Sequence, residues 1–498
     1  MKSKIWIIFI FSMVWTLIVS HNVALASNRS DLVSLIDKTM KDWDVPGLSV
    51  AIIRGEKVIF SSGFGYRDLK NKLRVTEETL FPIASCTKSF TAFSTAILVD
   101  EKKLDWDVPI IEYIPGFQMK NIFITKNITL RDLLSHRSGM PQHYRMYYNS
   151  GLSRKEIISR MKYLLLSESF RNSFQYTNLM YMLAAYVVEN VSGIPWEEFV
   201  NEKIFKTLHM MDSNFSLHES KITGNFSRPY RKTKDGIIEI PYFQVGSMTP
   251  AGGIISNISD LSNWLILQIN NGLFEGNQIV SSLSLTEMHT PQIRLPQYLK
   301  REKFPWSFYG LGWSIRTYKG NLMVSHGGGF DGFSSLISFM PGEKLGVVVL
   351  TNMENSPVPT ILANSFYDSL LDFKKTDWNS SYKKIFSNQS TRRDTEERHI
   401  DNVRLKTPLS CFSGEYYNPG YGSLIVKKTK KHLIIEHNNL SSMLRYCGNN
   451  VFKSVDEHFN LGSEPIKVSF NTNKKGEIES VSVPFEPNVD DILFIKKN

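Results

Sequence analysis

The sequence is poor in cysteine and lacks the motifs of metal and nucleotide chemistry. Three cysteines among 498 residues exclude a dense disulfide framework and a cysteine-rich zinc module. The chain contains no H-E-x-x-H, no P-loop and no strand-linked G-x-G-x-x-G. Because these motifs supply zinc ligands or backbone cradles for phosphates, we expect neither a metal nor a cofactor.

The chain also lacks any concentration of positive charge. Its 58 Lys and Arg residues exceed its 48 Asp and Glu residues, for a formal net charge of +10, but the excess is spread out. A nucleic-acid-binding protein would show clustered basic residues within a recognisable module, so we expect no nucleic-acid partner. The densest cluster, KKTKK at residues 427–431, lies between two β-like runs. It predicts a solvated hairpin turn, with binding to an anionic polymer or a membrane as the alternative.

Only the first residues form a long apolar run. Lys2 and Lys4 precede apolar residues 5–20, and the small-residue sequence A-L-A ends at Ala26. This order is typical of a secretory signal peptide, residues 1–26, cleaved after Ala26. The alternative is an uncleaved anchor, but the run is slightly shorter than the about 20 residues of a membrane span. Cleavage would lower the formal charge from +10 to +8 and leave a secreted or periplasmic protein without a transmembrane anchor.

Residues 31–373 mix strands and helices in a way that predicts an α/β (α+β) domain. Two segments, 48–65 and 336–354, read as β-hairpins that turn at Arg54–Glu56 and at Pro341–Gly342. Between them, apolar residues recur at helical spacing after Ser85 and again over 179–193. Hairpins at both ends of a helical middle predict an antiparallel sheet built from the two ends of the domain and flanked by helices.

The remainder of the chain differs in composition. Residues 374–408 are polar and charged and predict a linker or a solvated helix. Residues 409–498 contain short alternating runs separated by turn residues, which predict a small β-barrel or sandwich domain. Cys411 and Cys447 both fall in this last domain, and an oxidising compartment would permit a bridge between them.

Ser85 and Lys88 form the first candidate site. Residues three apart share one face of a helix, and free N–H groups at a helix start favour developing negative charge. A lysine in an apolar setting loses part of its preference for the charged form and can then accept a proton. The same S-x-x-K spacing recurs at Ser381 and Lys384, but only Ser85 opens an apolar helix. The alternative is that Ser85 caps the helix and Lys88 lies on the surface.

A nucleophile of this kind needs a second proton carrier and an oxyanion donor. Tyr176 and Asn178 form a Y-x-N directly before an apolar helix, which would fix them in place. Two further Y-x-N sequences begin at Tyr147 and Tyr416. The segment MVSHGGGFDGFSS, residues 323–335, predicts a strand on which bare glycine backbone lets a substrate approach closely. The alternative is a glycine-rich turn between strands.

Seven stretches together resemble one family, the serine hydrolases that include class C β-lactamases, D-Ala-D-Ala carboxypeptidases, D-aminopeptidases and related esterases. They follow the family's order over about residues 31–355 and read PGLSVAII, TLFPIASCTKSFTA, LLSHRSGMP, FQYTNLMYMLA, AGGIISNISDL, YGLGW and SHGGGFDGFSS. The resemblance implies a β-lactamase/transpeptidase-like fold, with an all-helical subregion beside the sheet. More loosely, the C-terminal segment resembles the β-barrel that some of these hydrolases carry.

The resemblance also implies roles for individual residues. Ser85 would be the nucleophile, and Lys88 would control the protonation of its hydroxyl. Tyr176 would accept a proton and later donate it, while Asn178 would hydrogen-bond the substrate amide. The backbone N–H groups of Ser85 and Gly329 would form the oxyanion hole. His136 and Asp260, which are typical of the family, are interpreted as structural: a residue that fixes a loop and an acid in the first turn of a helix.

The third motif departs from the K-T-G of β-lactamases and reads His326-Gly327-Gly328, with His326 and Gly328 as the expected substrate contacts. A histidine near its reference pKa of about 6.5 would hold an anionic substrate only at acid pH. An H-x-G third motif occurs in the peptidase and esterase members of the family. The resemblance therefore implies acyl transfer on a small-molecule or peptide substrate, an amide or an ester, of the peptidase or esterase type. The alternatives are a class C-type β-lactamase and an inactive homologue that binds cell-wall fragments or a partner.

Overall fold

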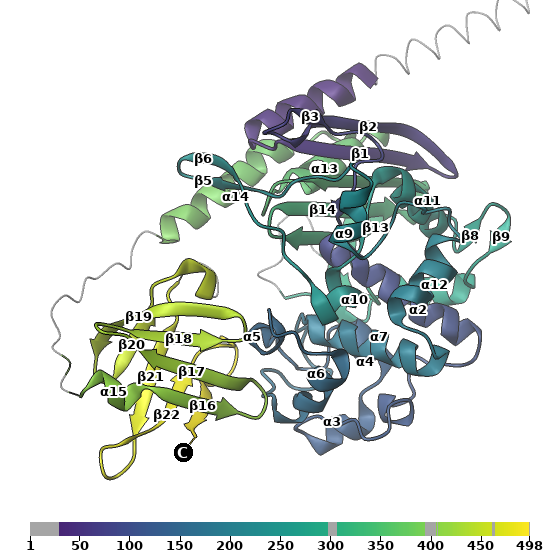
Figure 1. Ribbon diagram of the computed structural model, residues 1–498. Helices are drawn as coiled ribbons and strands as arrows, with labels where there is room; N and C mark the ends of the chain where they lie inside the picture. The colour runs from purple at the N-terminus through teal and green to yellow at the C-terminus, as the bar shows by residue number, and fades with distance from the viewer. Residues whose placement is uncertain (1–28, 297–305, 394–404, 406, 461–463, 498) are drawn as a thin grey trace, which may run out of the picture.

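A nine-stranded antiparallel sheet forms the centre of the N-terminal domain in the computed structural model (Figure 1). The structure describes residues 29–296, 306–393, 405, 407–460 and 464–497. The segment expected to be a signal peptide lies outside them, and no helix within them is long and apolar enough to cross a membrane. The strands in sheet order are β10 Ile293–Arg294, β11 Ser307–Tyr309, β12 Ser314–Tyr318, β13 Asn321–Phe330, β14 Phe333–Met340, β15 Leu345–Thr351, β1 Gly47–Arg54, β2 Lys57–Asp68 and β3 Leu73–Arg74.

The two ends of this domain meet in the middle of the sheet. β1 pairs with β15 in antiparallel register, with Leu48 opposite Thr351 and Arg54 opposite Leu345. Both hairpins predicted from the sequence, β1–β2 and β14–β15, are present. The predicted antiparallel sheet flanked by helices is therefore confirmed.

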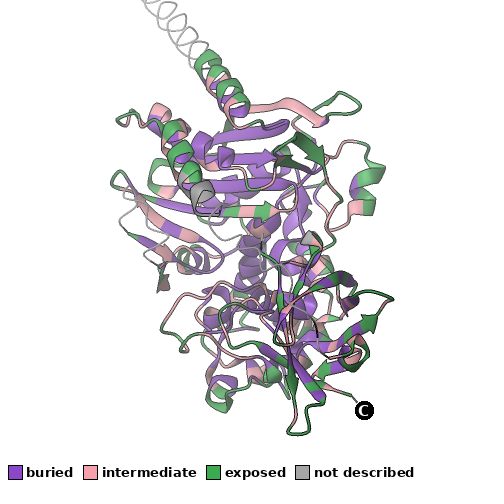
Figure 2. Ribbon diagram, turned by 90° about the vertical axis from the view of Figure 1, so that its left-hand side faces the viewer, coloured by how far each residue is buried: buried purple, intermediate pink, exposed green. Residues whose placement is uncertain are grey.

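The sheet is covered by helices on both faces, so its central strands are buried along their length (Figure 2). Alternate side chains of a strand point to opposite faces. Val50 and Ile52 accordingly pack with the helix at residues 29–42 and with α13 (Val358–Leu370). Ala51 and Ile53 face the larger core, which contains α11 (Ile258–Ile269), α2 (Thr87–Asp100) and α7 (Asn178–Ser192).

α2 is the most deeply buried helix of this core, as its apolar sequence predicts. Every residue from Thr87 to Leu98 is buried. Phe90 stacks on Trp264 of α11 with ring centroids 4.0 Å apart, and Phe93 meets the same indole edge-on at 5.0 Å. These aromatic contacts join the sheet side of the core to the helical side, so the start of α2 is held from several directions.

The remaining elements of the domain are short. Its helices are α3 Ile122–Asn127, α4 Leu130–Leu134, α5 Tyr144–Tyr147, α6 Arg154–Arg160, α8 Trp196–Val200, α9 Leu217–Ile222, α10 Thr249–Gly252 and α12 Ser282–Met288. Three two-stranded pairs join β4 Phe81–Pro82 to β7 Ile255–Ser256, β5 Tyr230–Thr233 to β6 Gly236–Glu239, and β8 Leu273–Phe274 to β9 Asn277–Gln278. The polar stretch predicted as a linker or solvated helix contains α14 (Trp378–Arg393).

The C-terminal part is a closed eight-stranded barrel, which resolves the choice between a barrel and a sandwich. The short α15 (Leu409–Phe412) precedes it. Closure leaves no free strand edge, and aromatic rings such as Phe412, Phe452 and Phe470 fill the interior. The strands are β16 Gly414–Asn418, β17 Gly422–Lys428, β18 Leu433–His437, β19 Leu440–Gly448, β20 Val451–Ser454, β21 Lys467–Thr472, β22 Ile478–Val483 and β23 Ile492–Lys496.

Two smaller expectations for this domain can be compared with the barrel. Cys411 and Cys447 are both free, so the bridge that the sequence permitted is not formed. The basic cluster at residues 427–431 spans the β17–β18 turn, where the Thr429 N–H donates to the His432 carbonyl at 2.8 Å. The prediction of a hairpin turn is confirmed.

The barrel contacts the N-terminal domain chiefly at residues 143–149, a segment that includes α5 and lies beside the barrel in Figure 1. Arg145 is only 2% exposed. Its guanidinium donates to the Asn460 carbonyl at 3.0 Å and lies 5.2 Å from the Phe459 ring centroid. From the β18–β19 turn, the Asn438 amide donates to the carbonyls of Arg145 and Tyr148 at 2.9 and 3.1 Å. The barrel therefore fixes the backbone of this segment.

Substituting Asn438 tests how much this contact stabilises the chain. Asn438 has a φ of 52°, so glycine keeps the backbone conformation and removes only the side-chain hydrogen bonds. We expect Asn438→Gly to lower the free energy of unfolding by about 1–3 kcal/mol and to speed amide hydrogen exchange in residues 143–149. Asn450→Gly, at a φ of 59° elsewhere in the barrel, is the control. Equal effects of the two substitutions would contradict this account.

Candidate active site

Ser85 lies on the one-turn 3-10 helix η1 (Ala84–Cys86), which leads directly into α2. Ala84 before it has a φ of 48°, a left-handed conformation that is uncommon for a residue with a Cβ and often occurs at functional sites. The hydroxyl is half-buried and reaches a cavity, while the helix that follows runs into the core. Ser85 thus lies at the N-terminal end of the buried helix α2, as the sequence predicts.

Lys88 lies one turn further along and is completely buried. Its Nζ is 3.2 Å from Ser85 Oγ, 2.8 Å from Asn178 Oδ1 and 2.7 Å from the Ala251 carbonyl oxygen. Burial lowers the pKa of Lys88 well below its ordinary value of 10.5. A neutral amine has two N–H donors, which match the two oxygens of Asn178 and Ala251. Its lone pair is then left for the Ser85 hydroxyl proton.

Tyr176 contacts the same hydroxyl from the other side. Its phenol donates to Ser85 Oγ at 2.8 Å, and its ring centroid lies 4.8 Å from Lys88 Nζ. Burial raises the pKa of Tyr176, so the phenol keeps its proton across the physiological range. In the resting site the tyrosine is therefore a donor and the lysine is the group able to accept.

Tyr176 is held in place by His136. The backbone N–H of Thr177 donates to His136 Nδ1 at 3.2 Å, and the imidazole lies 4.3 Å from the Tyr176 ring between centroids. Burial, with a contribution from Lys88, lowers the pKa of His136 well below 6.5, so the ring is neutral. These contacts agree with the interpretation of His136 as a residue that fixes a loop.

Asp260 is likewise structural. It lies in the first turn of α11, as predicted, and its carboxylate accepts from the Ser213 N–H at 2.8 Å and from the Asp212 N–H at 3.0 Å. Burial raises the pKa of Asp260 to about 6.

The glycines of the third motif let β13 approach the nucleophile. A Cβ on Gly328 would lie 2.2 Å from both the Ile83 carbonyl oxygen and Ser335 Oγ, so only glycine fits between β13 and η1. Gly329, one residue on, has open space on its side-chain face and lines the same cavity as Ser85. The predicted strand is confirmed, and its Gly329 lies at the same cavity as Ser85.

His326 is buried beside the site and is not among the described residues that line the cavity. Its Nε2 lies 2.8 Å from the Tyr309 hydroxyl, and its Nδ1 lies 2.8 Å from the Gly327 carbonyl oxygen. Burial, then the proximity of Lys88, lowers the pKa of His326 to about 3. The expectation that this imidazole would hold an anion just below neutral pH is therefore wrong, because the ring is uncharged there.

The cavity above Ser85 has a volume of about 280 Å³ and an aromatic wall that sequence reasoning missed. Tyr144, Tyr147 and Tyr148 line it, and Asn178 Nδ2 donates to the Tyr147 hydroxyl at 3.4 Å. Three tyrosines within five residues were the available signal. The Y-x-N at Tyr147, treated as a rival of Tyr176, is part of this wall, which is the segment that the barrel fixes.

A serine hydroxyl in contact with a buried lysine and a tyrosine, at the junction of an antiparallel sheet and a helical region, is the arrangement expected of a serine hydrolase of the penicillin-binding-protein type. Residues 32–371 match the family described as Beta-lactamase, and the chain belongs to that family. Residues 404–496 match a domain of unknown function, DUF3471, which covers the barrel.

Two named relatives are similar to this chain over most of its length. Unguisins hydrolase ungD' of Aspergillus campestris is 29% identical over 424 residues, which are 80% of this chain and 77% of that protein. Protein flp of Staphylococcus aureus is 23% identical over 344 residues, 67% of this chain and 65% of that protein.

Solved structures show the same fold. The octameric penicillin-binding protein homologue from Pyrococcus abyssi has a TM-score of 0.61 at 24% identity and covers 93% of this chain and 99% of its own. A class C β-lactamase from Rhodobacter sphaeroides has a TM-score of 0.56 at 18% identity. The match covers 68% of this chain and 98% of the β-lactamase chain.

The close approach at Gly328 can be tested directly. Gly328→Ala should separate β13 from η1, lower the free energy of unfolding by about 1–3 kcal/mol and slow covalent labelling of Ser85 by a fluorophosphonate. Gly342→Ala, where a Cβ would meet nothing within 4 Å, should change neither. Normal labelling in Gly328→Ala would show that the spacing between β13 and η1 is not critical.

The uncharged state of Lys88 predicts a pH dependence of stability. Between its lowered pKa and 10.5, the unfolded chain binds one proton more at this residue than the folded chain, so stability rises with pH. Relative to Lys88→Met, the wild-type free energy of unfolding should increase by about 1.4 kcal/mol per pH unit in that window. Denaturant titrations from pH 7 to pH 10 measure the slope. Parallel curves for the two proteins would mean that Lys88 is charged when folded.

Proposed function

We propose that this enzyme hydrolyses an amide or ester of a small molecule or peptide through an acyl-enzyme on Ser85. The observation that carries the proposal is the position of Ser85 Oγ, 3.2 Å from the buried Lys88 amine and 2.8 Å from the Tyr176 phenol. One neighbour can accept the hydroxyl proton and the other can donate, which is what an activated serine requires.

In the first half of the reaction Lys88 accepts the Ser85 proton while Oγ attacks the substrate carbonyl carbon. The backbone N–H groups of Ser85 and Gly329 stabilise the oxyanion. As the tetrahedral intermediate collapses, the carbon–nitrogen or carbon–oxygen bond breaks, and Tyr176 supplies the proton that the leaving group needs. This assigns the first proton acceptance to Lys88 rather than to Tyr176, because the pKa of the lysine is lowered and that of the tyrosine is raised.

In the second half, water replaces the leaving group and attacks the acyl carbon with the same residues in reversed roles. Asn178 lines the cavity, and the substrate amide would lie against its side chain. No step needs a metal or cofactor.

The β-lactamase alternative is less well supported. His326 stands where β-lactamases have a lysine, and its neutral, buried ring supplies no positive charge for a β-lactam carboxylate. The non-enzymatic alternative, an inactive cell-wall or partner-binding homologue, would not need Ser85, Lys88 and Tyr176 in mutual contact. The name of the Aspergillus relative, unguisins hydrolase, supports hydrolysis. We also propose secretion or periplasmic export through residues 1–26.

Covalent labelling tests the nucleophile. A fluorophosphonate should add one adduct to the wild-type protein by intact mass, and Ser85→Ala should abolish the adduct with a nearly unchanged melting temperature. Ser381→Ala, at the other S-x-x-K, should label normally. An adduct that persists in Ser85→Ala, or that peptide mapping places on another residue, would refute the proposal.

A further inference from the structure

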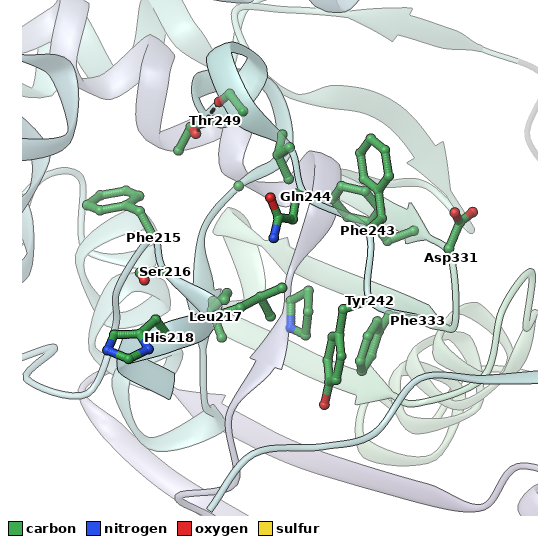
Figure 3. A pocket seen from close by; sticks show the side chains of 17 residues that line it. Phe215, Ser216, Leu217, His218, Tyr242, Phe243, Gln244, Thr249, Asp331 and Phe333 are labelled. Atoms are coloured by element: carbon green, nitrogen blue, oxygen red, sulfur yellow. Dashed lines mark hydrogen bonds between the residues drawn. The ribbon is translucent and has the colours of Figure 1, made fainter. Parts of the chain in front are cut away.

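A second cavity adjoins the one that contains Ser85. It has a volume of about 350 Å³ and is shown in Figure 3. The two cavities share six lining residues, so together they form one extended site: Phe243, Gln244, Val245, Gly252, Phe330 and Asp331. A substrate whose reacting carbonyl lies at Ser85 can therefore extend into the second cavity.

The second cavity is mainly apolar and aromatic. Phe243 forms its border with the first cavity and packs between two rings, parallel to Tyr148 at 4.8 Å and tilted against Phe330 at 5.1 Å between centroids. The apolar side chains that line the cavity further in are Phe215, Leu217, Tyr242, Ile255 and Phe333. Such a lining binds an apolar or aromatic group and fixes it by stacking.

Asp331 is the charged residue common to both cavities. It follows β13, two residues after Gly329, and Figure 3 shows it at the edge of the second cavity, on the side of Phe243 and Phe333. Burial and the nearby Glu354 raise the pKa of Asp331, while the nearby Arg231 acts in the opposite direction and lowers it. The net shift is upward, so Arg231 offsets only part of the cost of burying this carboxylate. Within the described part of the chain, no residue forms a hydrogen bond or a salt bridge with this carboxylate.

The basic groups nearest to Asp331 are Arg231, which is paired with Glu354, and His218, which lines the second cavity. Glu354 lines the first cavity, but its carboxylate is already paired with Arg231. Of the described residues that line either cavity, none is a lysine or an arginine. A substrate carboxylate would be repelled by Asp331, whereas a substrate ammonium would relieve the part of the desolvated charge that Arg231 does not offset.

We propose that this enzyme selects amides or esters whose acyl part carries a free, positively charged amine and an apolar or aromatic side chain. Asp331 binds the ammonium, and the second cavity binds the side chain. This inference rests on the proposed function of Ser85. The distance is suitable, because two residues of extended backbone from Gly329 to Asp331 span about 7 Å, within reach of an amine near the reacting carbonyl.

Three chromogenic probes test the selection: phenylalanine p-nitroanilide, its N-acetyl derivative and alanine p-nitroanilide, each as the D and the L enantiomer. The wild-type enzyme should prefer free-amine phenylalanine in one enantiomeric series. Asp331→Asn should lower kcat/KM for this probe about tenfold or more, mainly through KM, and leave the N-acetyl probe within about twofold. Asp235→Asn, an exposed acid on the β5–β6 turn, should change neither rate.

The apolar cavity is tested by filling it. Leu217→Trp should lower kcat/KM for phenylalanine p-nitroanilide at least fivefold while sparing alanine p-nitroanilide. Equal losses of the charged and neutral probes in Asp331→Asn, or no loss of either, would overturn the inference. Fluorophosphonate labelling and hydrolysis of p-nitrophenyl acetate report on Ser85 separately. If both are present without discrimination for the amine, only this inference fails; if both are absent, the proposed function fails as well.

Discussion

The burial of Lys88 is the constraint on which the arrangement of the site depends, because several elements of the fold must enclose this one amine. Lys88 is fully enclosed, and its Nζ is contacted by groups from three separate elements: Ser85 on η1, Asn178 on α7 and the Ala251 carbonyl on α10. An ammonium ion in such a place would be costly, so the site favours the neutral amine. The surrounding aromatic core, with Phe90 stacked on Trp264, keeps water out and the three elements together. The proposed reactivity of Ser85 would thus depend on a lysine whose charged form is destabilised by burial.

The strongest sequence signals were local. Ser85 could be located because an apolar helix follows it directly, and the hairpins of the sheet could be located from strand periodicity and turn residues. The closed barrel was predicted only as one of two possibilities, because short alternating strands do not reveal how a sheet closes. His326 was located correctly on a strand, but its protonation was predicted wrongly. The burial of His326 depends on how closely β13 packs against η1. That packing, and the proximity of Lys88 to His326, arise from contacts between residues that are far apart in sequence.

The features that sequence reasoning missed are all non-local. The tyrosine wall at residues 144–148 forms part of the site only because the chain brings it over Ser85, and Asp331 gains its position from where β13 ends. Both lie in stretches that the sequence analysis quoted, the Y-x-N at Tyr147 and SHGGGFDGFSS, but neither stretch indicated a side chain that lines the cavity. The contact of Arg145 with the barrel is of the same kind, since it joins segments more than 300 residues apart. Motifs indicated the chemistry, whereas the shape of the cavity and its charge required the folded chain.

The attachment of the barrel to residues 143–149 has a thermodynamic consequence. The groups proposed to perform the chemistry are held by η1, α2 and α7 inside the main core. The tyrosine wall of the cavity is instead held by the β18–β19 turn of the barrel. Segments that are held by different structural units can open at different free energies. Gradual warming, or a molecule that binds the barrel, would then broaden the range of accepted substrates before it stopped hydrolysis. The barrel would thus influence selectivity through the tyrosine wall rather than through Ser85 and Lys88.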